Sequence, residues 1–230
     1  MKLFMLLTFL AALCSNAFGQ TMENVVELKG KGDDSQAFAI AYKLAQFGNG
    51  EAMVFVGDAL IYGSGITKDI ELGIKYLERA GQHGYSNGWT WLGILFERGD
   101  ALPQSFVRAA MYFEKSAGFA DAYAQARLAY FYMSGKGVAK SYAEAARYAV
   151  YSARQGNSDA QTILGLLYSE GKGIERNLLI AHMWLNIAAS QGNDFSATAR
   201  DRLENQLTGP QIQAAELKAQ RCQRTSYREC

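Results

Sequence analysis

The loop "SEGKGIERN" has the residue types of a phosphate-binding site, because two glycines flank a lysine in Gly171-Lys172-Gly173. A nucleotide-binding P-loop has the spacing G-x-x-x-x-G-K-[ST], follows a strand and supplies a hydroxyl for the metal ion. Here glycine follows the lysine, and the preceding residues have the apolar spacing of a helix. The loop is therefore predicted to be a turn between two helices.

The two histidines, His83 and His182, are the next candidates for chemistry. A nucleophilic mechanism needs a Cys or Ser beside its base, and no cysteine is placed to pair with His182. The carboxylates are scattered along helix faces, as solvated charges are. We predict no catalytic, metal-binding or cofactor-binding residue and no enzymatic activity, and we interpret His182 as a packing or surface side chain.

The N-terminus has the features of an export signal. Lys2 is followed by the apolar run "LFMLLTFLAALC", and the small residues Ala17 and Gly19 precede a cleavage point before Gln20. A membrane anchor is the alternative, but the run is too short to span a bilayer comfortably. A lipoprotein cysteine at Cys14 fits poorly after the bulky Leu13. We predict a signal peptide at 1–19 and a periplasmic or secreted protein.

Cleavage at this point would leave two cysteines, Cys222 and Cys230, at the C-terminus. In an oxidising compartment, cysteines that close so short a loop are expected to form a disulfide. A redox or metal site is the alternative, but zinc requires four ligands and both histidines lie far away in the sequence. The pair is predicted to be a structural disulfide.

The balance of charges argues against two classes of partner. The 230 residues include 23 basic and 22 acidic side chains, and 49% of the residues are hydrophobic. Nucleic-acid binding normally requires a basic patch, and anionic membranes attract polybasic clusters. We expect neither partner, and no membrane span once the signal is removed.

A repeat of 36 residues organises the chain. Glycines and aromatic side chains recur at this step without insertion or deletion through four copies, as the series Gly63/Gly99/Gly135/Gly171 and Tyr76/Tyr112/Tyr148/Trp184 show. Such a period is the signature of a solenoid, in which each repeat buries its apolar face against its neighbours. Four repeats are predicted at 51–85, 86–121, 122–157 and 158–194.

Each repeat is predicted to be two antiparallel helices. The second helix should begin after the N-cap residues Asp69, Ser105, Ser141 and Asn177, and should end at left-handed glycines such as Gly84, Gly156 and Gly192. Small residues in the first helix should let neighbouring helices approach closely. Residues 35–50 are predicted to be a capping helix and 195–230 two capping helices with the disulfide; the sequence leaves the order of residues 20–34 open.

The segment "AQTILGLLYSEGKGIERNLLIAHMWLNIAASQGN" resembles the Sel-one-like repeat family, a relative of the tetratricopeptide solenoids. The resemblance covers about residues 35–222 and departs most in the second repeat, where Phe96 and Ala101 replace a tyrosine and a glycine. It implies an all-α fold, a right-handed α/α superhelical solenoid of antiparallel helix pairs, and protein–protein interaction. Exported members include scaffolds of envelope assembly and immunity proteins against phospholipase-type effectors.

If the first helices line the concave side, as in tetratricopeptide arrays, the variable positions there are the candidate partner site. Aromatic residues and arginine gather among them, and these types are enriched at binding hot spots. An ordinary core between repeats is the alternative for the aromatic residues. The predicted partner-binding residues are Phe55, Asp58, Tyr62, Trp91, Ile94, Arg98, Arg127 and Tyr130.

The function expected from the sequence is a non-catalytic interaction module in the periplasm. We expect an immunity or inhibitor protein for a secreted lipase or phospholipase effector, with a scaffold of the cell envelope as the alternative. A cysteine-rich branch of the family that binds or hydrolyses β-lactams is a further alternative. That branch has cysteine pairs inside its repeats, which this chain lacks.

Overall fold

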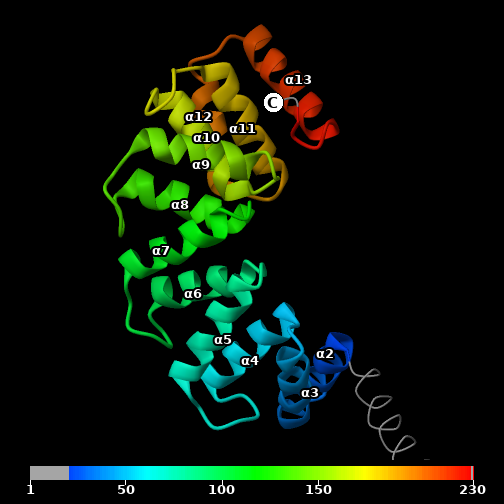
Figure 1. Ribbon diagram of the computed structural model, residues 1–230. Coiled ribbons are helices and arrows are strands. Elements are labelled where there is room, and N and C mark those ends of the chain that lie inside the picture. The colour runs from blue at the N-terminus through cyan, green and yellow to red at the C-terminus, as the bar shows by residue number, and fades with distance from the viewer. Residues whose placement is uncertain (1–20, 229) are drawn as a thin grey trace, which may run out of the picture. The chain divides into compact units, whose positions relative to one another are not determined.

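The computed structural model describes residues 21–228 and 230, and every regular element in this part of the chain is an α-helix (Figure 1). The predicted all-α solenoid is confirmed. The helices are α2 (Met22–Gly30), α3 (Asp34–Gln46), α4 (Gly50–Tyr62), α5 (Ile70–Gln82), α6 (Asn87–Arg98), α7 (Phe106–Ala117), α8 (Ala122–Ser134), α9 (Tyr142–Ala153), α10 (Ser158–Glu170), α11 (Leu178–Ser190), α12 (Asp194–Glu204) and α13 (Gly209–Arg224). The chain divides into two compact units within α6, with unit 1 ending at Leu92 and unit 2 being Gly93–Cys230.

Consecutive helices pack as pairs, as their short connections require. In unit 1, α4 packs on α5, and α2, α3 and α4 pack in succession. In unit 2, α8 packs on α9 and α10 on α11, while α9 packs on α10 and joins one pair to the next. The first helix of each repeat is thus α4, α6, α8 or α10, and α8 and α10 also contact each other directly.

The predicted caps begin the second helices. Asp69, Ser105, Ser141 and Asn177 each accept a hydrogen bond from the backbone N–H three residues later, so the cap predictions are confirmed. A side-chain cap of this kind stabilises a helix by about 1 kcal/mol. At the ends of these helices Gly84, Gly156 and Gly192 have φ of 85°, 88° and 88°, which confirms the predicted left-handed glycines.

The small residues of the first helices are required by close packing. A Cβ added to Gly165 would lie 2.7 Å from Leu185 Cγ of the following helix, and one at Gly93 would lie 2.6 Å from the Phe113 ring. Real Cβ atoms do not approach so closely, so glycine sets the distance between these helices. The second-helix aromatic residue packs in the core, and Trp184 is 3% exposed.

Both ends of the described chain carry additional helices. Residues 20–34, whose order the sequence left open, contain α2, and its Val25 is fully buried in the core of unit 1. At the other end α12 and α13 both pack on α11, and Cys222 and Cys230 form the predicted disulfide with their Cα atoms 4.9 Å apart. The predicted signal peptide at 1–19 lies outside the described residues.

Candidate functional site

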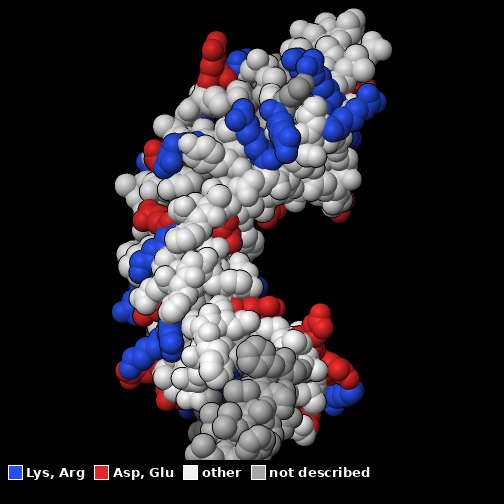
Figure 2. Space-filling model, turned by 45° about the vertical axis from the view of Figure 1, so that its right-hand side comes forward, with Lys and Arg blue, Asp and Glu red and all other residues white. Residues whose placement is uncertain are grey.

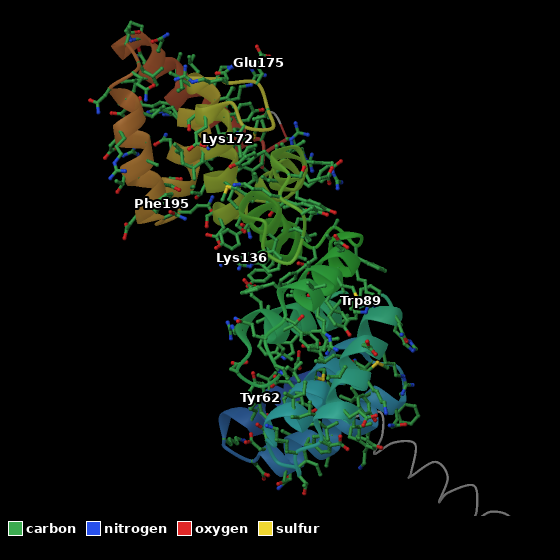
Figure 3. All side chains as sticks on the ribbon, turned by 90° about the vertical axis from the view of Figure 1, so that its left-hand side faces the viewer. Tyr62, Trp89, Lys136, Lys172, Glu175 and Phe195 are labelled. Atoms are coloured by element: carbon green, nitrogen blue, oxygen red, sulfur yellow. A yellow bond between two sulfur atoms is a disulfide. The ribbon has the colours of Figure 1, made fainter. Side chains whose placement is uncertain are left out.

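The glycine–lysine loop packs against the preceding repeat. Gly173 lies so close to the carbonyl oxygen of Tyr142 that a Cβ would overlap it. Lys172, labelled in Figure 3, lies 5.4 Å from the centre of the Tyr142 ring and pairs with Glu170 at 2.6 Å. One repeat earlier, Lys136 lies 5.3 Å from the ring of Phe106. The loop is the predicted turn, and its lysine joins adjacent repeats through cation–π contacts.

His182 is a core residue of α11, as the packing interpretation expected. Its side chain is fully buried, and Nε2 lies 3.0 Å from Oε1 of Glu204 in α12. Nδ1 is buried and has no hydrogen-bond partner among the described residues. His182 therefore packs in the interior between α11 and α12. Among the described residues no group of His, Cys, Asp and Glu is arranged to hold a metal ion.

The candidate site is one face of the first helices, which we call the first-helix stripe. It comprises positions 51, 55, 58 and 62, which follow the i, i+4, i+7 spacing of a single helix face, and their equivalents at steps of 36 residues. Each unit has a hollow of about 400 Å³ or slightly less, lined mainly by this stripe. The stripe is therefore where the surface of each unit is recessed.

In unit 1 the stripe forms an aromatic hollow, which we call the unit-1 hollow. Trp91 Nε1 donates a hydrogen bond of 2.9 Å to Oδ1 of Asp58, and Lys29 lies 5.1 Å from the centre of the Phe55 ring. Burial raises the pKa of Asp58, and the bond from Trp91 and the charge of Lys29 oppose this rise. The lining residues are Met22, Val26, Glu51, Val54, Phe55, Asp58, Tyr85, Asn87 and Trp91.

In unit 2 the stripe residues of α8 and α10 and the start of α12 form a groove, which we call the unit-2 groove. Arg127 Nε donates to Glu97 Oε2 at 3.0 Å and its Nη2 to Oε1, so the two side chains form a bidentate pair. The guanidinium also lies 5.1 Å from the centre of the Tyr130 ring, and burial lowers the pKa of Arg127. The lining residues are Tyr123, Ala126, Arg127, Tyr130, Met133, Asp159, Thr162, Ile163, Leu166, Asn193 and Phe195.

The structure thus places five of the eight predicted residues in these two hollows. Phe55, Asp58 and Trp91 line the first, and Arg127 and Tyr130 line the second. The other three, Tyr62, Ile94 and Arg98, line neither. Tyr62 and Arg98 are exposed at the C-terminal ends of α4 and α6, and Ile94 is half-buried.

Sequence reasoning missed the column one helical turn earlier. Tyr123 and Phe195 belong to it, are 40% and 63% exposed, and line the unit-2 groove together with Asp159 (Figure 3 labels Phe195). Glu51 and Asn87 are the equivalent residues in the unit-1 hollow. The signal that could have revealed these residues was their spacing, four residues before the column of Phe55, with a different residue type in each repeat.

Charge is unevenly distributed near the C-terminus. Figure 2 shows Lys and Arg side chains gathered at that end of unit 2, where α13 carries Arg221 and Arg224 in its last turn.

Across the part of the chain that the structure describes, no helix has the length and apolar character needed to cross a membrane.

Comparison with known proteins bears on the fold and the family. A Sel1 repeat protein from Oxalobacter formigenes superposes with a TM-score of 0.69 at 23% identity, over 78% of this chain and 74% of that chain. The protective antigen c5321 of uropathogenic Escherichia coli, which displays an SLR fold, has a TM-score of 0.50 at 26% identity, over 84% of this chain and 50% of that chain. The immunity protein Pa5087 of Pseudomonas aeruginosa has a TM-score of 0.46 at 21% identity, over 84% and 73%.

No protein with curated annotation matches the chain. The Sel1 repeat model matches residues 50–85, 90–117, 122–157 and 158–193, which together make up more than half of the sequence. These four segments coincide closely with the helix pairs that carry the first-helix stripe. The chain belongs to the Sel1 repeat family.

Proposed function

We propose that the protein is a non-catalytic interaction module, exported to the periplasm, that binds a partner protein through the first-helix stripe. Sel1 repeats suggest a protein-binding role, and the hollow of each unit is lined mainly by that unit's own part of the stripe. The disulfide between Cys222 and Cys230 is consistent with an oxidising compartment.

One observation carries this proposal: exposed aromatic side chains project at the unit-2 groove. Tyr123 and Phe195 are 40% and 63% exposed, and both line this groove. Aromatic side chains that can enter a partner's pocket are the usual anchors of protein interfaces. The half-buried Arg127, already oriented by Glu97, lies beside them, so part of the surface is ordered before binding.

For the partner we propose a secreted lipase or phospholipase effector that this protein neutralises. A scaffold role in envelope assembly is the competing function, and the identity of the partner separates the two. Affinity capture with the tagged mature protein from its native envelope, followed by mass spectrometry, should yield a lipase-type effector as the main specific partner. Recovery of envelope-assembly proteins alone would contradict the immunity role.

Two variants test the location of the site. Tyr123→Ala with Phe195→Ala should lower capture of the partner at least about tenfold, because each removes an aromatic anchor. Phe47→Ala with Tyr151→Ala is the matched control, since these aromatic residues are 83% and 50% exposed but lie outside the stripe. Equal capture by both double variants would place the binding site elsewhere.

A further inference from the structure

The unit-1 hollow combines an apolar interior with a rim of carboxylates. Phe55, Tyr85 and Trp91 supply aromatic surface, and Val26 of α2 is 63% exposed at its edge. Contiguous apolar surface with a polar rim is typical of a protein-interaction site. The interior therefore suits an apolar side chain of a partner.

The charged residues that line this hollow and its neighbouring depression are all acidic. Glu51 and Asp58 line it, and Glu23 and Glu27 of α2 line an adjoining depression that shares Val26 and Glu51 with it. No lysine or arginine is among the residues that line either depression. Proximity of acidic side chains to Tyr85 is also visible in its pKa, which burial raises most and the Glu51 charge raises further.

Nearby cations neutralise only part of this charge. Lys31 pairs with Glu27 at 2.6 Å, and Lys29 lies over the Phe55 ring near Asp58. Glu23 and Glu51 form no ion pair within the described chain. The unit-2 groove differs, because its Arg127 is matched by the carboxylate of Glu97. The uncompensated carboxylates, Glu51 in the hollow and Glu23 in the adjoining depression, attract cations, and exposed aromatic faces bind cations as well.

We propose that the unit-1 hollow binds a segment of the partner protein that presents an apolar side chain flanked by lysine or arginine. The inference rests on the proposed function and specifies the chemistry of the partner for one part of the stripe. The apolar side chain enters between the aromatic rings, and the flanking cations meet Glu23 and Glu51. Complementary charge of this kind mainly sets the association rate and the choice of partner.

A second copy of this chain is the competing occupant. Helix α13 presents Lys218, Arg221 and Arg224, and its Leu217 is 59% exposed. An apolar side chain flanked by lysine and arginine, as we propose for the partner, is thus also present at the C-terminal end of this chain, where Figure 2 shows basic side chains. Self-association must therefore be measured together with peptide binding.

The test uses the full mature chain and two labelled probes, a short amphipathic leucine–lysine peptide and its leucine–glutamate counterpart of equal length. Fluorescence anisotropy should show that the lysine peptide binds at least about tenfold more tightly. Glu23→Gln with Glu51→Gln should weaken binding of the lysine peptide about tenfold, because it removes the two unpaired carboxylates. The Glu27–Lys31 pair stays intact in this variant. Val26→Gln, which changes no charge, should weaken it by a similar factor through lost apolar contact.

The matched control is Glu175→Gln with Glu216→Gln, which changes net charge equally at exposed sites of unit 2. It should leave the affinity for the lysine peptide within about twofold. Equal loss in both double variants would mean that only net charge matters and would overturn the proposal. So would equal affinity for the two peptides, or sedimentation showing self-association of the protein alone that Glu23→Gln with Glu51→Gln abolishes.

The experiments separate an error in the assignment of the unit-1 hollow from an error in the proposed function. Partner capture that depends on Tyr123 and Phe195, with no preference for the lysine peptide, would overturn the unit-1 assignment alone. Partner capture that ignores Tyr123 and Phe195 would instead contradict the location of the site in the proposed function, whatever the peptides show.

Discussion

Ala120 occupies a position with left-handed backbone at which the other repeats have glycine. Its φ is 60°, in the left-handed region, where the equivalent residues Gly48, Gly84, Gly156 and Gly192 have φ of 85° to 89°. A Cβ in this region costs about 1–2 kcal/mol, and glycine avoids that cost. We expect Ala120→Gly to raise the free energy of unfolding by about 1 kcal/mol in urea titrations.

The control for this substitution is Ala117→Gly, three residues earlier and at the end of α7. There the backbone is helical, so the same change should lower the free energy of unfolding by about 0.5–1 kcal/mol. Two substitutions of identical chemistry should thus have opposite signs. If Ala120→Gly destabilises as well, the left-handed conformation is not the source of the strain.

The turn glycine Gly173 should be less replaceable than Gly192. Both have positive φ, but a Cβ at Gly192 meets nothing within 4 Å, whereas one at Gly173 overlaps the Tyr142 carbonyl. Gly192→Ala should cost about 1–2 kcal/mol of unfolding free energy, and Gly173→Ala about 2–5 kcal/mol because overpacking adds to the conformational cost. Thermal unfolding of both variants measures the difference. Equal losses would mean that the turn can move away from α9.

Asp58 gives unit 1 a pH dependence. Burial raises its pKa, so the folded chain binds the proton more tightly than the unfolded chain. Its contribution to stability therefore falls as pH rises from the unfolded pKa through the raised folded pKa, and the penalty is complete above that range. Asp58→Asn keeps an acceptor for Trp91 Nε1 and should remove this slope. The free energy of unfolding of the variant minus that of the wild-type protein should rise as pH increases from 3 to 7, and a difference that does not change with pH would assign the slope to other groups.

At the scale of helices, the sequence predicted what depends on local chemistry. Asn177 caps α11 and Gly192 ends it, because both effects act within a few residues. The partners of Arg127 and Lys172 were not predicted, since Glu97 and Tyr142 lie 30 residues earlier and their reach depends on how neighbouring helices are offset. Tyr123 was missed for a different reason, because its column four residues before Phe55 was not considered.

The pair between Glu97 of α6 and Arg127 of α8 should stabilise unit 2 by holding two helices together. Their side chains are only 16% and 25% exposed, so removing one partner leaves a poorly solvated charge. Arg127→Met should lower the free energy of unfolding by about 1–3 kcal/mol, and adding Glu97→Gln should restore part of the loss. A double-mutant cycle in urea measures the coupling. A coupling near zero would show that the pair behaves as a surface ion pair.

At the scale of the whole chain, stability should be transmitted between neighbouring repeats, because each helix pair contacts mainly the next. The C-terminal end illustrates this: the disulfide loop places Tyr227 against Gly156 at the end of α9, and α13 covers α11. Tyr227 and Ser226 both have left-handed backbone, with φ of 64° and 50°, and the closed loop holds them there.

Cys222→Ser with Cys230→Ser should therefore loosen the C-terminal end first. Opening so short a loop should cost about 2–3 kcal/mol. Hydrogen exchange should accelerate in α13 and in α11 beneath it, whereas α4 and α5 of unit 1 should exchange as before, because local opening spreads only through direct contacts. Reductant should reproduce this pattern in the wild-type protein and have no further effect on the variant. Equally faster hydrogen exchange in both units would show that the chain unfolds as one cooperative body. The C-terminal helices would then stabilise the whole chain and not only the last repeat.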